Sequence, residues 1–94
     1  MKKYQIVFRN NSAEKSWNVL RKNIPDALER CKMFLTMSPL DRMKSNGKLK
    51  KLRGELEGIL QYNITDSARV RYEVDQKLMR VLILYVGAHP HKHK

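Results

Sequence analysis

The 94-residue sequence predicts one α+β domain, in which two N-terminal helices pack on one face of an antiparallel sheet of about four strands. Three observations predict this class. One short alternating segment opens the chain, two segments with helical spacing of apolar residues follow, and three strand-like segments complete it. The expected order is therefore β-α-α-β-β-β, over a single domain that spans residues 1–94. The sheet face away from the helices is expected to be open to a ligand.

The first strand is expected over residues 4–8, where Tyr4, Ile6 and Phe8 alternate along the segment before the turn pair at residues 10–11. A helix follows directly. Asn11 with Glu14 three residues later is typical of a capping box. Residues at spacings of three and four then form its apolar face: Ala13, Trp17, Leu20 and Ile24.

Pro25 ends the first helix and suits the first turn of a second one, because proline has no backbone N–H to donate. The apolar stripe of this second helix consists of Ala27, Leu28, Cys31, Phe34 and Leu35. Residues 38–47 mix serine, proline, aspartate, asparagine and glycine, so we expect a loop there, and the least ordered part of the chain.

Three strands are expected in the C-terminal half, over residues 59–64, 70–74 and 79–86. The first two form a hairpin through the turn at residues 65–68, and a second turn at residues 75–77 leads to the third. The third segment is almost continuously apolar, which is typical of a central strand covered on both faces. Gly87 is expected to end it, before a short polar tail.

The charge balance is strongly basic, with 20 lysines and arginines against 9 aspartates and glutamates, a formal net charge of +11. Such an excess favours polyanionic partners, and nucleic acid is the commonest of these, because basic side chains displace the counterions condensed on phosphates. A membrane surface and an acidic protein are the other two candidates.

No segment approaches the roughly 20 apolar residues that span a bilayer, and the N-terminal residues lack the apolar core of a signal peptide. We therefore expect a cytoplasmic protein with no membrane partner. Cys31 is the single cysteine, so an intramolecular disulfide is excluded, and its apolar surroundings predict a buried, inert thiol. The sequence predicts neither a native metal site nor a cofactor.

Residues 51–75 carry two short motifs in order. The first is Lys51-Leu52-Arg53-Gly54-Glu55-Leu56-Glu57-Gly58, and the second is Arg69-Val70-Arg71-Tyr72-Glu73-Val74-Asp75 after a Thr-Asp turn. The chain resembles the RelE/ParE superfamily of toxins, whose members typically carry Lys-Leu-x-Gly-x-Leu-x-Gly and Arg-Val-x-Tyr-x-Val-Asp. The sequence Val86-Gly87-Ala88-His89 is similar to members with a histidine after the last strand. Residues 1–45 match only in the order of their elements.

The resemblance implies a type II toxin that cleaves messenger RNA on the ribosome and forms a hetero-oligomer with an antitoxin. An acidic antitoxin fits the charge of +11. The superfamily also contains gyrase-inhibiting toxins of the same fold, so the fold alone does not decide the activity. A third alternative is a ribosome- or RNA-binding module without catalysis.

Metal-independent cleavage of RNA needs a proton acceptor, a proton donor and cations at the phosphate. His89 is the candidate acid or base, because an imidazole titrates near neutral pH. The resemblance assigns Arg69 to stabilise the charge of the transition state. The RNA-binding candidates are Lys48, Lys51, Arg53 and, if its side chain shares the open face with residue 69, Arg71.

Other interpretations stay open for these residues. His89 can be part of a solvated tail with His91 and His93, and Arg69 can be an ion-pair partner of Glu73 or Asp75. The chain also departs from the family pattern at two points. Asn63 stands where members often have arginine, and no aromatic residue follows Tyr85. Either a base-stacking or proton-transfer group is missing from the chain, or Tyr62 or Tyr72 replaces it.

Overall fold

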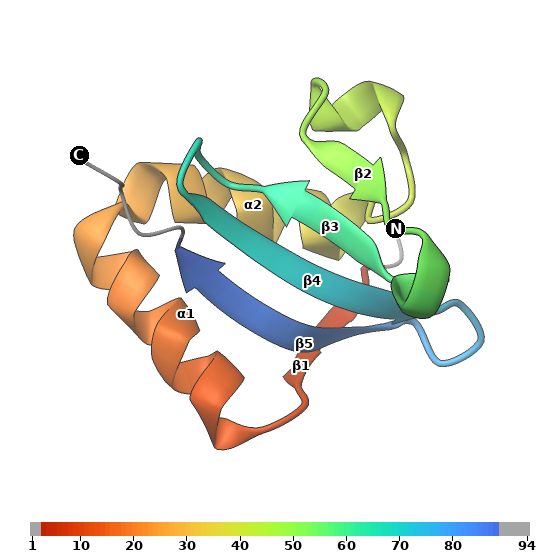
Figure 1. Ribbon diagram of the computed structural model, residues 1–94, viewed down its shortest axis with the longest axis horizontal. Helices are drawn as coiled ribbons and strands as arrows, with labels where there is room; N and C mark the ends of the chain where they lie inside the picture. The colour runs from red at the N-terminus through yellow and green to blue at the C-terminus, as the bar shows by residue number, and fades with distance from the viewer. Residues whose placement is uncertain (1–2, 89–94) are drawn as a thin grey trace.

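The computed structural model describes residues 3–88 and forms a twisted sheet with helices on one side (Figure 1). In this part of the chain there are five strands, two α-helices and two short 3-10 turns. In chain order the elements are β1 (Gln5–Phe8), α1 (Asn11–Asn23), α2 (Pro25–Met37), η1 (Met43–Ser45), β2 (Leu49–Lys51), η2 (Gly54–Leu56), β3 (Leu60–Asn63), β4 (Ala68–Asp75) and β5 (Arg80–Ala88). The α+β class predicted from the sequence is confirmed.

The order of strands in the sheet is β1-β5-β4-β3-β2. Strands β3, β4 and β5 form the predicted antiparallel meander. The sheet differs from the prediction in two ways. Strand β2 is an additional edge strand that pairs antiparallel with β3, and β1 pairs parallel with β5, with Gln5 opposite Arg80 and Phe8 opposite Ile83.

Both helices begin and end close to where the sequence places them. The cap of α1 is Asn10, one residue before the predicted Asn11, and its Oδ1 accepts a hydrogen bond from the backbone N–H of Ala13 at 2.9 Å. Pro25 is the first residue of α2, as predicted. Within residues 3–88 no helix is both long and apolar enough to cross a membrane.

The core lies between the helices and one face of the sheet. In Figure 1, α2 lies behind β3 and β4, whereas α1 runs beside β5. Phe8 meets Trp17 edge to face at 5.6 Å between ring centroids, and Phe34 stacks on Tyr62 at 4.9 Å. Cys31 is fully buried, as the sequence predicts, and burial raises the pKa of its thiol well above the ordinary value.

The segment between α2 and β2 is a loop, as predicted, but several hydrogen bonds hold it against the domain. The Tyr72 hydroxyl donates to the carbonyl of Pro39 at 2.7 Å, and both residues are fully buried. The Ser45 hydroxyl donates to the carbonyl of Arg42 at 2.7 Å and accepts from the backbone N–H of Leu49 at 3.3 Å. This loop is therefore anchored to the start of β2.

Candidate nucleic-acid interface

Strand β4 separates a buried face from an open one. Its buried residues Ala68, Val70 and Tyr72 alternate with Arg69 and Arg71, which keep partial exposure. Since successive side chains of a strand point to opposite faces, the two arginines lie together on the face away from the helices. The sequence places Arg71 in the site only if its side chain shares the open face with Arg69, and the structure shows that it does.

The register of the sheet places polar side chains in two rows across this open face. One row runs from β2 to β5 through Lys50, Gln61, Arg71 and Tyr85. The next row contains Asn63 opposite Arg69, with Gly87 on the other side of Arg69. Side chains from β3, β4 and β5 therefore meet in one patch, which we call the open-face cluster and define as Gln61, Asn63, Arg69, Arg71 and Tyr85.

A chain of hydrogen bonds orders part of the open-face cluster. The Arg71 Nε–H donates to Oε1 of Gln61 at 3.1 Å, and Nε2 of Gln61 donates to Oδ1 of Asn63 at 3.0 Å. Gln61 is only 7% exposed although it lies on the open face, because its neighbours cover it. The bond to Gln61 uses the Nε–H of Arg71, so the four N–H groups of the two terminal nitrogens are available to an anion.

Tyr85 occupies the β5 side of the cluster. The guanidinium carbon of Arg71 lies 5.5 Å from the centroid of its ring, and Tyr85 remains 47% exposed. The ring leans over Gly87, where an added Cβ would overlap the hydroxyl and lie 2.6 Å from the ring carbon Cζ. Gly87 does not end the strand, as the sequence predicted, because β5 continues to Ala88. Its role is to leave room for the Tyr85 ring.

Two other expectations about β5 also need correction. The apolar run was predicted to be a strand covered on both faces, whereas its helix face is buried at Val81 and Ile83 and its other face is partly open, with Tyr85 exposed. Met79 belongs to the preceding turn, with φ = 53°. A bulge next to Leu84 shifts the register, so that Arg71 faces Tyr85 while Tyr72 faces Ile83.

Neither Tyr62 nor Tyr72 replaces the aromatic residue that the family pattern places near its C-terminus. Tyr62 is 5% exposed and stacks on Phe34, and Tyr72 is fully buried with its hydroxyl bound to Pro39. Burial raises the pKa of both phenols above their ordinary value. Both tyrosines are core residues, and Tyr85 is the aromatic residue that the structure places beside the arginines.

The structure also separates Arg69 from the acids suggested as its ion-pair partners. Glu73 is four residues along the same strand, roughly 13 Å away at the usual rise. Asp75 is further away, and its Oδ1 accepts a hydrogen bond from the backbone N–H of Leu78 at 3.0 Å. The position of Arg69 therefore favours contact with an external anion.

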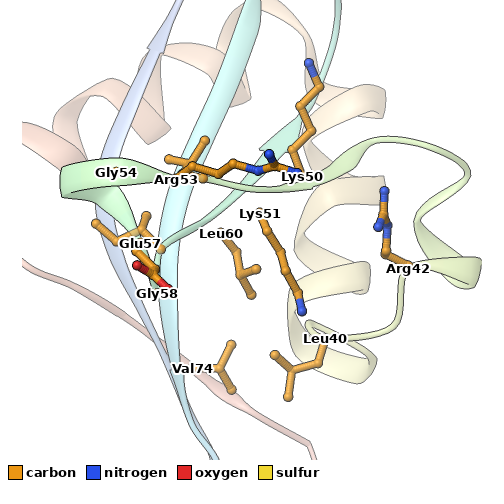
Figure 2. Close-up of a pocket in the computed structure, with 12 residues that line it drawn as sticks. Leu40, Arg42, Lys50, Lys51, Arg53, Gly54, Glu57, Gly58, Leu60 and Val74 are labelled. Carbon is orange, nitrogen blue, oxygen red and sulfur yellow. The ribbon is translucent and has the colours of Figure 1, made fainter.

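A second basic region lies at the β2 edge of the sheet, where side chains surround a hollow of about 900 Å³ (Figure 2). Its cations are Arg42, Lys50, Lys51 and Arg53, with Glu57 as the acid among the lining residues. We call this region the edge pocket. Gly54 and Gly58 of the Lys-Leu-x-Gly-x-Leu-x-Gly motif form its rim with φ = 69° and 93°, values that favour glycine, so the motif encodes the turn from β2 to β3.

The predicted RNA-binding residues therefore divide between two regions. Arg71 belongs to the open-face cluster, whereas Lys51 and Arg53 line the edge pocket. Lys48 immediately precedes β2, and its carbonyl accepts a hydrogen bond from the backbone N–H of Asn63 at 2.9 Å. His89 lies outside the described residues, and the last described residue, Ala88, pairs with Ala68.

Sequence reasoning missed Gln61 and Tyr85 as members of the cluster. Two signals point to them in hindsight. Residues 61 and 63 precede the turn of the same hairpin that carries residues 69 and 71, so period-two alternation groups the four on one face. An aromatic residue two positions before a glycine in a strand shares a face with it, and its ring can cover the bare backbone.

No family model and no curated protein matches this chain. Solved structures do match it. A chain of the toxin–antitoxin complex RelBE2 from Mycobacterium tuberculosis is 25% identical, with a TM-score of 0.61 over 97% of each chain. The YoeB/ParE toxin from Agrobacterium tumefaciens is 17% identical, with a TM-score of 0.65 over 90% of this chain and 98% of that toxin. A chain of the YoeB–YefM complex from Staphylococcus aureus is 20% identical, with a TM-score of 0.62 over 92% and 97%. The resemblance to the RelE/ParE superfamily seen in residues 51–75 is thus confirmed by the fold of the chain.

Proposed function

We propose that this chain is the toxin of a type II toxin–antitoxin pair, and that it cleaves messenger RNA on the ribosome without a metal or cofactor. The observation that supports the proposal most is the position of Arg69 and Arg71, which lie on one open sheet face in a chain that has the fold of RelE and YoeB toxins. Two guanidinium groups on one face suit a phosphate whose charge increases during the reaction.

The reaction that this face supports is attack of a ribose 2′-oxygen on the adjacent phosphorus. The O2′–P bond forms, the P–O5′ bond breaks, and the products are a 2′,3′-cyclic phosphate and a free 5′-hydroxyl. Arg69 and the terminal N–H groups of Arg71 stabilise the additional negative charge on the phosphoryl oxygens. A base removes the 2′-proton, an acid protonates O5′, and His89 is proposed for one of these two steps.

The partners proposed for the chain follow from its charge. A net charge of +11 suits messenger and ribosomal RNA, and it also suits an acidic antitoxin that covers the basic regions until it is removed. Two of the three matched structures described above are toxin–antitoxin complexes, which supports an antitoxin partner for this chain. Action on translating ribosomes places the proposed activity in the cytoplasm.

The test is induction of the chain in a bacterial translation system, followed by primer-extension mapping of a reporter message with and without ribosomes. We expect cuts only in translated message and in register with codons. Arg69→Ala and His89→Ala are expected to remove the cuts while the proteins stay folded. Arg21→Ala removes the same charge from the exposed surface of α1 and is expected to leave the cuts unchanged.

Two results would overturn the proposal. An intact message together with inhibited DNA supercoiling by purified gyrase would identify a gyrase-inhibiting toxin. An intact message with salt-sensitive RNA binding and no growth defect would identify a non-catalytic binding module.

A further inference from the structure

Tyr85 differs from the other tyrosines of the sheet because its ring has no core to pack against. It is 47% exposed, whereas Tyr62 and Tyr72 are 5% and 0% exposed. The ring is nevertheless confined. Gly87 lies beneath it, and the Arg71 guanidinium lies 5.5 Å from its centroid. An exposed aromatic ring that is held in place loses little conformational freedom when a ligand stacks on it.

The groups around the ring indicate which ligand it takes. Arg69 and Arg71 carry positive charge on the same face, and the carboxamides of Gln61 and Asn63 are already engaged with Arg71 and with each other. An anionic ligand with a flat, apolar part fits this combination of cations and an exposed ring. Single-stranded nucleic acid has this chemistry, because each nucleotide joins a phosphate to a planar base that is free to stack.

We propose that the Tyr85 ring is the platform on which one unpaired base of the RNA stacks, while Arg69 and Arg71 hold adjacent phosphates. The inference deepens the proposed function and rests on it for the identity of the ligand as RNA. The platform recognises the planar face of the base and not its hydrogen-bonding edge, because the carboxamide of Gln61, in the same row of side chains, is engaged through both Oε1 and Nε2. It is therefore expected to accept all four bases, with a preference for the larger purine surface.

The test uses an eight-nucleotide single-stranded RNA that carries 2′-O-methyl groups, which prevent cleavage, and one 2-aminopurine at each position in turn. Its fluorescence falls when the base stacks on an aromatic ring. Binding is measured with the free oligonucleotide and with ribosomes programmed with it. We expect wild-type protein to quench the probe at one position, and Tyr85→Phe, which keeps the ring, to do the same.

Tyr85→Leu keeps apolar bulk but removes the aromatic face. It is expected to abolish the quenching and to weaken binding about 5- to 150-fold, the range typical for loss of one stacked base. Retention of the fold is checked by the unchanged near-ultraviolet signal of buried Trp17.

Gly87→Ala provides a second variant that leaves the tyrosine in place. Its new Cβ collides with the ring, which must move, so the variant is expected to lose quenching and affinity as Tyr85→Leu does. Because both changes act through the same ring, adding Gly87→Ala to Tyr85→Leu is expected to change affinity less than twofold.

The outcomes separate this inference from the proposed function. Quenching that depends on Tyr85 without any cleavage of message supports the platform and refutes the nuclease. Codon-registered cleavage with no quenching by wild-type protein, or with quenching and affinity unchanged in Tyr85→Leu, overturns the platform and leaves the nuclease standing.

Discussion

The two faces of the sheet place the same kinds of residue in opposite environments. On the helix face, Tyr72 is fully buried, and its hydroxyl is bound to the carbonyl of Pro39. On the open face, Tyr85 is exposed beside Arg71, and the nearest polar groups form a chain of side-chain hydrogen bonds. Alternate residues of the same strands therefore supply the stability on one side and the candidate site on the other.

Core packing behind the strands positions the open-face cluster although the cluster lies on the surface. The strands that carry Arg69, Arg71 and Tyr85 are fixed from behind by Val70, Tyr72 and other core residues. On the open face, two side-chain hydrogen bonds, of 3.0 and 3.1 Å, then order Gln61, Asn63 and Arg71. A site built on strands in this way holds its groups more accurately than a site built on loops. The edge pocket differs, because its cations come from the three-residue strand β2 and from the segments on either side of it.

The largest difference is expected when arginine is replaced by lysine in the two basic regions. Arg71→Lys keeps the charge but loses the Nε–H bond to Gln61 and the planar group beside Tyr85, so message cleavage is expected to fall on the order of 10- to 100-fold. Arg53→Lys in the edge pocket is expected to change cleavage less than about twofold, because a point charge is sufficient there. The measurement is the rate of appearance of primer-extension products.

Equal losses in the two lysine variants would contradict the distinction between an ordered cluster and a diffuse basic pocket. The unfolding midpoint in urea is the control for both proteins. We expect it to shift little, because the side chains of residues 53 and 71 lie outside the core.

The free energy of unfolding of the protein is expected to fall at alkaline pH because of two buried groups on the helix face. Burial raises the pKa values of Cys31 and Tyr72 in the folded protein, so the folded state holds these protons after the unfolded chain has released them. Their contribution is fully present below the unfolded pKa values of about 8.5 and 10, and it is lost as pH rises above them. Each group lowers the free energy of unfolding by about 1.4 kcal/mol per pH unit above its unfolded pKa.

The measurement is the urea midpoint between pH 7 and pH 11. Cys31→Ala removes the group that titrates first. The decline of the urea midpoint between pH 8.5 and 10 is therefore expected to become shallower, whatever the stability of the variant at pH 7. A decline equally steep in the variant would show that the thiol is not the group responsible.

The sequence predicted the elements that depend on local pattern. Both helices, the hairpin and the last strand follow from periodicity, and Pro25 marks the boundary between the helices. It did not predict β2, because Leu49-Lys50-Lys51 has one apolar residue and becomes a strand only by pairing with β3. The parallel direction of β1 was missed for a similar reason, since it is set by a partner more than 70 residues away.

The candidate site shows the same limit. Arg69 and Arg71 were found because the motif places them two residues apart in a strand. The ring of Tyr85 and the carboxamide of Gln61 were not, because their roles depend on which strand lies beside which, and on a bulge that sets the register between β4 and β5. Contacts between strands join residues that are far apart in the sequence, so the spacing of residues along the chain does not predict them.

The same substitution on the two faces is expected to have unequal effects on stability. Tyr72→Phe removes the hydrogen bond to Pro39 and leaves a buried carbonyl without its donor, so the free energy of unfolding is expected to fall by about 1–2 kcal/mol. Tyr85→Phe removes an exposed hydroxyl and is expected to change it by less than about 0.5 kcal/mol. Urea unfolding at pH 7 measures both. A larger loss for Tyr85→Phe would show that the open face also contributes to stability.

The smallest effects are expected from single cations of the edge pocket, and they identify what this pocket does. If Lys50, Lys51 and Arg53 contact RNA phosphates, replacement of each by alanine lowers the slope of log affinity against log salt by about 0.7. Between 50 and 200 mM salt this is a difference of about two- to threefold for each residue, independent of RNA sequence.

The salt titration also separates the pocket from the open face in a single assay with the 2′-O-methyl RNA. Tyr85→Leu is expected to weaken binding at every salt concentration with the slope unchanged, because stacking releases no counterions. Lys22→Ala, on the exposed surface of α1, controls for net charge and is expected to leave both affinity and slope near the wild-type values. A slope unchanged by all three pocket variants would mean that the pocket does not contact phosphate. The +11 charge would then act on RNA only through the open face, and the edge pocket would remain available for an acidic antitoxin.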